Sequence, residues 1–131
     1  EGAISTHVAD HCLTNDIDPQ RSADFHEDAR TLDISGAEWV VTNPPFNQAF
    51  EILQHLLLFD LPIALCLRLS FLEPTEQRQG LLEWRPPDSL IILPRYSFRF
   101  NDRGKRQTDS VTCAWMIWNY TLCPAIQVSP R

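Results

Sequence analysis

The residues with the clearest chemical potential stand in one short stretch, Thr42-Asn43-Pro44-Pro45-Phe46. Asn43 offers a side-chain carbonyl and Pro44 a main-chain carbonyl, and both are hydrogen-bond acceptors. Phe46 adds an aromatic face on which a flat ring can stack. This set suits a planar substrate with an exocyclic amino group, because two carbonyls can take the two amine hydrogens. Holding the amine in this way favours a pyramidal nitrogen as charge develops, and that helps it to accept an electrophilic methyl group.

The flanking residues place this stretch at the end of a strand. Residues 37–42 are apolar enough for a buried strand, and the two prolines end it because neither can donate to a ladder. Apolar residues at helical spacing predict a helix over residues 46–60, with Asn47 in position to cap it. A loop at the carboxyl end of a strand is where open α/β sheets bind ligands. In the alternative interpretation, Phe46 packs into the core of its own helix.

Asn43-Pro44-Pro45-Phe46 resembles the catalytic motif of S-adenosylmethionine-dependent methyltransferases that modify exocyclic or side-chain amide nitrogens. Within that group it is most similar to DNA adenine-N6 methyltransferases of the phage type. The resemblance implies an α/β, Rossmann-like, mostly parallel sheet and methyl transfer to a nucleic-acid base, with adenine in DNA preferred. Guanine-N2 in ribosomal RNA, glutamine in a protein, and a non-catalytic binding subunit remain as alternatives. An ordinary strand-to-helix turn is the plain alternative to all of these.

The same resemblance assigns S-adenosylmethionine to the early part of the chain. Asp16, at the tip of a short strand, would accept hydrogen bonds from ribose hydroxyls, and Ile17 would pack on the adenine. Asp24 would accept the adenine amino group with Phe25 against the ring, and Asp28 is the competing carboxylate. Plain turn chemistry also explains acidic residues near a proline. Only seven residues separate Asp16 from Asp24, so we expect the next strand to be short or its helix absent.

The family's glycine-rich turn follows its first strand, and Glu1-Gly2 corresponds to the tail of that turn. The resemblance therefore makes Gly2 a cofactor-binding residue. The first strand itself would lie upstream, so we expect residues 1–131 to form a single methyltransferase domain whose sheet is incomplete.

The second half of the chain is expected to complete the sheet. Apolar runs predict strands at residues 63–69, 90–93 and 111–120, and a short helix at residues 75–84. A polar turn precedes the last of these runs. We therefore expect parallel strands followed by a terminal antiparallel hairpin.

Charge is distributed unevenly along the chain. Residues 1–60 hold 11 acidic and 2 basic side chains, a net charge of −9, whereas residues 61–131 hold 6 acidic and 9 basic ones, a net charge of +3. Around residue 100 cations alternate with aromatic residues, a pattern typical of contacts with phosphates and unpaired bases. A half-buried strand with arginines on its solvent face explains the alternation equally well. The predicted nucleic-acid contacts, with DNA as the preferred partner, are Arg95, Arg99, Arg103, Lys105 and Arg106.

Composition argues against several other classes. The net charge of −6 disfavours a protein that coats nucleic acid without selectivity. No apolar run is long enough to span a membrane, so we expect a soluble, cytoplasmic protein. The four cysteines form no Cys-x-x-Cys pair, and His7 and His11 beside Cys12 lack a third convergent ligand, so we expect no metal site. No serine stands in a nucleophile-elbow pattern.

Overall fold

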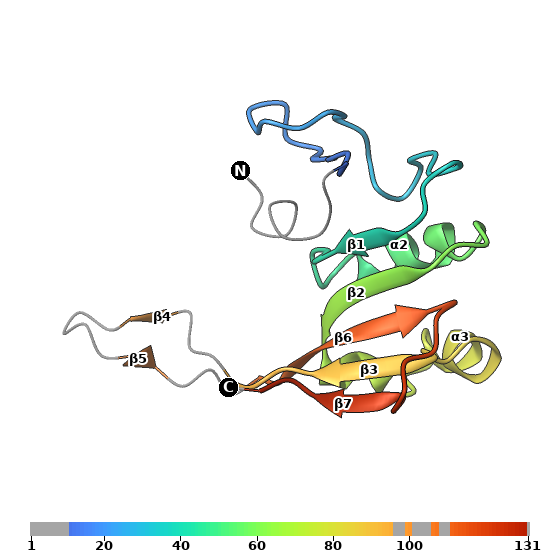
Figure 1. Ribbon diagram of the computed structural model, residues 1–131, viewed down its shortest axis with the longest axis vertical. Coiled ribbons are helices and arrows are strands. Elements are labelled where there is room, and N and C mark those ends of the chain that lie inside the picture. Colours follow the sequence, from blue (N-terminus) through green and yellow to red (C-terminus); the bar gives the residue numbers. More distant parts are fainter. Residues whose placement is uncertain (1–10, 96–98, 101–105, 108–110, 131) are drawn as a thin grey trace.

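The computed structural model describes residues 11–95, 99–100, 106–107 and 111–130, and it places an open, mixed sheet at the centre of the fold (Figure 1). The strands of this sheet are β1 (Val40–Thr42), β2 (Ile63–Arg68), β3 (Ser89–Ile92), β6 (Cys113–Trp118) and β7 (Ile126–Val128). Their spatial order is β1-β2-β6-β3-β7. β1 is parallel to β2 and β3 to β7, whereas β6 is antiparallel to both of its neighbours. Four strands therefore run in one direction and β6 runs against them.

The helices of the described chain pack on one face of the sheet. They are α2 (Ala49–Leu56), the 3-10 helix η1 (Leu69–Leu72) and α3 (Gln79–Trp84), which share one hydrophobic cluster with the sheet. A small antiparallel pair, β4 (Arg99–Phe100) and β5 (Arg106–Gln107), stands apart from the main sheet. Figure 1 shows this pair beyond the end toward which β1, β3 and β7 point.

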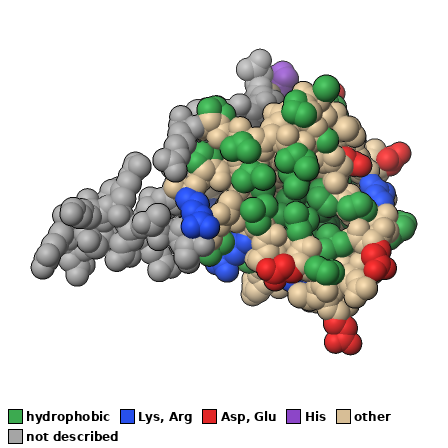
Figure 2. Space-filling model, turned by 90° about the horizontal axis from the view of Figure 1, so that it is seen from below, with side chains coloured by type: hydrophobic (Ala, Val, Ile, Leu, Met, Phe, Trp, Pro, Cys, Tyr) green, Lys and Arg blue, Asp and Glu red, His purple; other side chains and the backbone are tan. Residues whose placement is uncertain are grey.

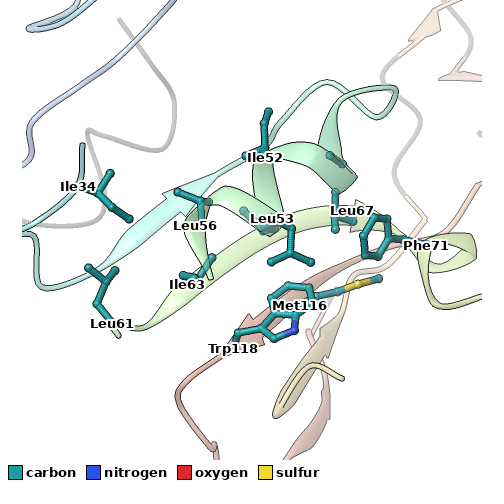
Figure 3. Close-up of a cluster of buried hydrophobic side chains, with 12 residues drawn as sticks. Ile34, Ile52, Leu53, Leu56, Leu61, Ile63, Leu67, Phe71, Met116 and Trp118 are labelled. Carbon is teal, nitrogen blue, oxygen red and sulfur yellow. The ribbon is translucent and has the colours of Figure 1, made fainter. Parts of the chain in front are cut away.

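The hydrophobic core fills the space between α2 and the sheet (Figure 3). Alternation along β2 turns Ile63, Leu65 and Leu67 to the same face, and none of the three is exposed. Leu53 of α2 lies against them and is also fully buried. Trp118 of β6 pairs with Ile63 across the antiparallel ladder, so its ring joins the same face. The contacts with α2 above this face and with Trp118 on the neighbouring strand therefore fix the rotation and the register of β2.

The opposite face of the sheet is apolar too. Val41, Cys66 and Trp115 are half-buried there, and Cys66 pairs with Trp115 across the ladder. Burial raises the pKa of the Cys66 thiol, which keeps it an uncharged apolar side chain. The described helices all pack on the first face, so none of them covers this one.

Hydrogen bonds close the end of the sheet opposite to the carboxyl end of β1. The Trp118 indole donates from Nε1 to the carbonyl of Arg85 (2.9 Å), and the Asn119 amide donates to the carbonyl of Leu61 (2.9 Å). The backbone N–H of Asn119 donates to the Asp88 carboxylate (2.7 Å). Asn119 has a φ of 60°, a left-handed conformation that asparagine tolerates better than most residues. These bonds hold β6 between β2 and β3.

The expected strands at residues 37–42, 63–69, 90–93 and 111–120 and the two expected helices are present, but some of the predicted boundaries are wrong. α2 begins at Ala49, with Gln48 rather than Asn47 at the N-cap and no side-chain capping bond. A turn comes first, because the Gln48 N–H donates to the carbonyl of Pro45 (3.0 Å). α3 begins at Gln79 rather than at Thr75, and a turn precedes it, in which the carbonyl of Thr75 accepts from the N–H of Arg78 (2.9 Å).

The predicted ending of the sheet is also corrected. β6 is antiparallel to β3, as expected, yet it lies between β2 and β3 rather than at an edge. The chain then continues to β7, which pairs in parallel with β3 and forms the edge in place of a terminal hairpin. Ile126 and Val128 of β7 are exposed. Figure 2, which views the molecule from this side, shows hydrophobic side chains across the centre of the face and acidic side chains mainly toward one side.

A matched pair of leucines tests this description of the core. Leu53→Ala removes a side chain with no exposed surface, and we expect it to lower the free energy of unfolding by about 2–5 kcal/mol. Leu58→Ala removes one that is 79% exposed, and its effect should stay within about 0.5 kcal/mol. Urea unfolding followed by tryptophan fluorescence measures both changes. Equal effects of the two substitutions would contradict the placement of α2.

Candidate functional site

The Asn-Pro-Pro-Phe motif follows directly after β1, which ends at Thr42. Because β1 and β2 are parallel, both strands reach their carboxyl ends at the same edge of the sheet. Asn43 is exposed there, whereas Pro44 is buried. The carbonyl of Pro45 then accepts a hydrogen bond in the turn that starts α2. The motif thus lies at the position where an open α/β sheet binds ligands.

The two acceptors of the motif have no hydrogen-bond partner within the described part of the chain. This holds for the side-chain amide of Asn43 and for the main-chain carbonyl of Pro44. Asn43 is exposed, so its amide can bind water or a ligand. The Pro44 carbonyl belongs to a buried residue and is the next acceptor along the chain.

The ring of Phe46 is 45% exposed and is covered on one face by a cation. The guanidinium carbon of Arg68 lies 4.3 Å from the centre of the ring. Arg68 is the last residue of β2 and the single charged residue of that strand. A cation at this distance is attracted by the negative face of the ring. The alternative in which Phe46 packs into the core of α2 is wrong, because the ring is exposed and the residue precedes the helix.

A cleft of about 710 Å³ opens beside Phe46. Aromatic and charged side chains line it together, among them Phe46, Phe50, Phe71, Glu51, Glu76 and Arg78. The guanidinium of Arg78 donates to the Thr75 hydroxyl and to the carbonyl of Ser70, both at 3.0 Å, and lies 5.3 Å from the centre of the Phe71 ring. With two carboxylates in the lining, this cleft suits a neutral flat group better than a phosphate.

The four described residues of the predicted cofactor site lie together on a local ribbon. Asn15 and Phe25 form an isolated parallel bridge, and the Asp16 N–H donates to the carbonyl of Phe25 (3.1 Å). Asp16 and Ile17 therefore end one extended segment, while Asp24 and Phe25 belong to its neighbour. No helix lies between the two segments, as the close spacing of Asp16 and Asp24 predicted.

The carboxylates of Asp24 and Asp28 differ in how many of their oxygens already have partners within the chain. One oxygen of Asp24 accepts hydrogen bonds from the Thr14 N–H (2.7 Å) and the Thr14 hydroxyl (2.9 Å), which lowers the pKa of Asp24. Asp28 binds the Arg30 guanidinium through both of its oxygens, and this pairing lowers its pKa to about 2. Asp28 is thus occupied by Arg30, whereas the second oxygen of Asp24 has no partner among the described residues.

The apolar residues of the ribbon are open to solvent. Ile17 is 63% exposed and Phe25 is 43% exposed, so each can offer a surface to a flat ring. The described residues of the ribbon form no ladder with β1, and Figure 1 shows the ribbon as a separate loop beyond that edge of the sheet. Gly2, the remaining predicted cofactor residue, lies outside the described residues.

The predicted nucleic-acid residues are described only in part. Arg95 is exposed and donates from Nε to the Thr112 hydroxyl (3.0 Å). Arg99 and Arg106 lie in β4 and β5, which pair with each other as antiparallel strands. Arg103 and Lys105 lie outside the described residues.

The described part of the chain holds neither a metal cluster nor a membrane-spanning helix. It contains no group of three His, Cys, Asp or Glu side chains arranged to hold a metal ion. Its helices are all too short or too polar to cross a membrane. His7, which the sequence places near His11 and Cys12, lies outside the described residues.

No family model, no curated protein and no solved structure matches this chain. The function must therefore be inferred from the chemistry and the placement of the chain's own residues. The strongest feature of this kind is the motif at the carboxyl end of β1, with its two acceptors and its exposed ring.

Arg68 and the cleft were missed by the sequence analysis. Arg68 ends an otherwise apolar strand, and parallel strands bring their carboxyl ends to one edge. A position near Phe46 could therefore have been inferred. The cleft gives no such signal, because it depends on how the turn at Thr75 lies against the start of α2.

The contact between Thr14 and Asp24 predicts a specific titration. The Asp24 pKa should lie below its ordinary value of 3.8. The contact therefore stabilises the ribbon above that pH, and this stabilisation is lost as the pH falls through the lowered pKa. Thr14→Val removes the hydroxyl donor but keeps the backbone N–H, so it should return the pKa only part of the way. A ¹³C NMR titration of the Asp24 carboxyl measures both values. A pKa at or above 3.8 in the unsubstituted protein would contradict the hydrogen bonds between Thr14 and Asp24.

Proposed function

We propose that this chain is the catalytic region of a Rossmann-like, S-adenosylmethionine-dependent methyltransferase that modifies the exocyclic amine of a nucleic-acid base, with adenine-N6 in DNA as the preferred target. The observation that carries the proposal is the geometry of the motif. Asn43 presents an amide without a partner among the described residues, beside the exposed ring of Phe46, at the carboxyl end of a parallel strand. A sheet with four strands in one direction agrees with this class of fold.

The motif residues have distinct roles toward the base. A base inside a duplex must leave the stack to be modified, and Phe46 offers it a new stacking surface. The Asn43 side-chain carbonyl and the Pro44 main-chain carbonyl accept the two amine hydrogens. This pairing orients the nitrogen lone pair away from the ring plane, and the orientation is in place before the reaction starts.

The ribbon residues fit the adenosine part of the cofactor. Asp16 can accept hydrogen bonds from ribose hydroxyls, and the unpaired oxygen of Asp24 can accept from the adenine amine. Ile17 and Phe25, both exposed, can cover the faces of the adenine. A bound S-adenosylmethionine would supply an electrophilic methyl group and leave as S-adenosylhomocysteine, and the methylated amine would release one proton to solvent.

The basic second half of the chain favours a polyanionic partner. Arg95, Arg99 and Arg106 belong to or adjoin the β4–β5 pair, which lies beyond the end of the sheet that carries the motif (Figure 1). Arg95 is exposed and can bind a phosphate while the base occupies the motif. A protein-glutamine methyltransferase would not need the net charge of +3 in residues 61–131, so this charge supports nucleic acid as the substrate.

Substitution of Asn43 tests the proposal. Asn43→Ala should lower kcat for methyl transfer by about 10²–10³, the usual cost of losing an oriented group at the reacting centre, with little change in cofactor affinity. Asn43→Asp keeps an acceptor oxygen and should retain more activity than the alanine variant. Turnover is measured with radiolabelled cofactor and duplex DNA, and cofactor affinity by calorimetry.

Parallel assays with structured RNA and with a glutamine-containing peptide identify the substrate class. Transfer to RNA or to the peptide alone would replace DNA as the substrate. Cofactor binding without transfer to any of the three would favour a binding subunit. Wild-type turnover in Asn43→Ala would overturn the assigned role of the motif.

A further inference from the structure

We propose that Arg68 is a positioning residue for the methyl transfer, because it covers one face of Phe46 and so directs the target base to the other face, at the cleft. This inference rests on the proposed function. Its starting observation is the guanidinium carbon of Arg68, 4.3 Å from the centre of the Phe46 ring. Neither the motif nor the cofactor ribbon contains this arginine, which comes from β2.

The backbone sets the position of Arg68. The parallel ladder pairs Thr42 with Leu65, so β2 runs on past the end of β1 and reaches Arg68 beside the motif. Leu67 is fully buried on the helix face, and alternation turns the next side chain to the opposite face. Arg68 is therefore exposed, and its cation lies over the motif ring rather than in the core.

An aromatic ring offers two faces for stacking, and Arg68 occupies one of them. A base that approached on that face would have to displace the guanidinium and lose its attraction to the ring. Phe46 also lines the cleft of about 710 Å³, together with Phe50 and Phe71. The open face of the ring is thus the one that can receive a base next to other aromatic side chains.

The charged side chains of the cleft favour a neutral base over a phosphate. Glu51 and Glu76 line it, and the Arg78 guanidinium is already bound to Thr75 and Ser70. Two carboxylates repel a phosphate but not a neutral base. The cleft therefore suits the base itself, while the phosphates of the same strand remain outside it.

The test compares Arg68→Met and Arg68→Lys with Arg21→Gln in the full chain. Arg21 is 74% exposed, pairs only loosely with Asp18 at 3.9 Å, and serves as the control for loss of one surface cation. At saturating duplex DNA, Arg68→Met should lower kcat by roughly two- to fivefold, the range expected for an exposed cation–π contact, and Arg68→Lys should lie between it and wild type. KM for DNA and its salt dependence should stay unchanged, and Arg21→Gln should match wild type.

A double-mutant cycle shows whether Arg68 acts through the ring. In a Phe46→Leu background, Arg68→Met should cause no further loss of kcat, because the ring that it positions is gone. Independent, additive losses would overturn the inference. So would an unchanged kcat with a fall of about 0.9 in the logarithmic salt slope, since that result marks a phosphate contact.

The inference and the proposed function fail in different ways. If the wild-type protein transfers methyl groups to a base and Arg68→Met does so at the same kcat, only the inference is wrong. If the wild-type protein modifies no base, the proposed function is wrong and the inference falls with it. Thermal melting of each variant identifies any loss of kcat that comes from unfolding.

Discussion

The buried contact between β2 and α2 is the interaction on which the rest of the structure depends. Every second side chain of β2, those of Ile63, Leu65 and Leu67, points into the core. Leu53 of α2 packs in the same core cluster. This packing fixes the register of β2 against β1 and β6, because a shift by one residue would move the apolar side chains to the other face. The end of β1, where the motif begins, and the end of β2, where Arg68 lies, are placed by the same contact.

The acceptors at this edge of the sheet are available because the backbone after Thr42 cannot continue the strand pairing. Pro44 and Pro45 have no N–H to continue a ladder, so the chain leaves the sheet directly after Thr42. The acceptors of Asn43 and Pro44 are consequently not used by β2, and within the described residues they have no other partner. A strand end that must stop pairing becomes a place where a substrate amine can bind. We infer the methyltransferase function from this arrangement.

Local patterns in the sequence predicted the individual strands and helices better than they predicted which strands lie next to each other. The strand, turn and helix around the motif were expected from the prolines and the apolar spacing, and the absence of a helix between Asp16 and Asp24 from their short separation. The place of β6 between β2 and β3 is set by long-range pairing, which periodicity does not encode. β7 is short and exposed, so it lacked the apolar run that signals a strand. The contact between Arg68 and Phe46 was missed, although the parallel strands β1 and β2 bring their carboxyl ends, and with them Arg68 and the motif, to one edge.

Identification of the methylated product tests the central claim most directly. The full chain is incubated with isotopically labelled S-adenosylmethionine and duplex DNA, the DNA is digested to nucleosides, and these are separated and analysed by mass spectrometry. Our account predicts label on an exocyclic amine, with N6-methyldeoxyadenosine as the expected product, because we propose that Asn43 and Pro44 act as a pair of acceptors for such an amine. Label on a ring nitrogen or ring carbon, or no labelled nucleoside from DNA, would contradict it.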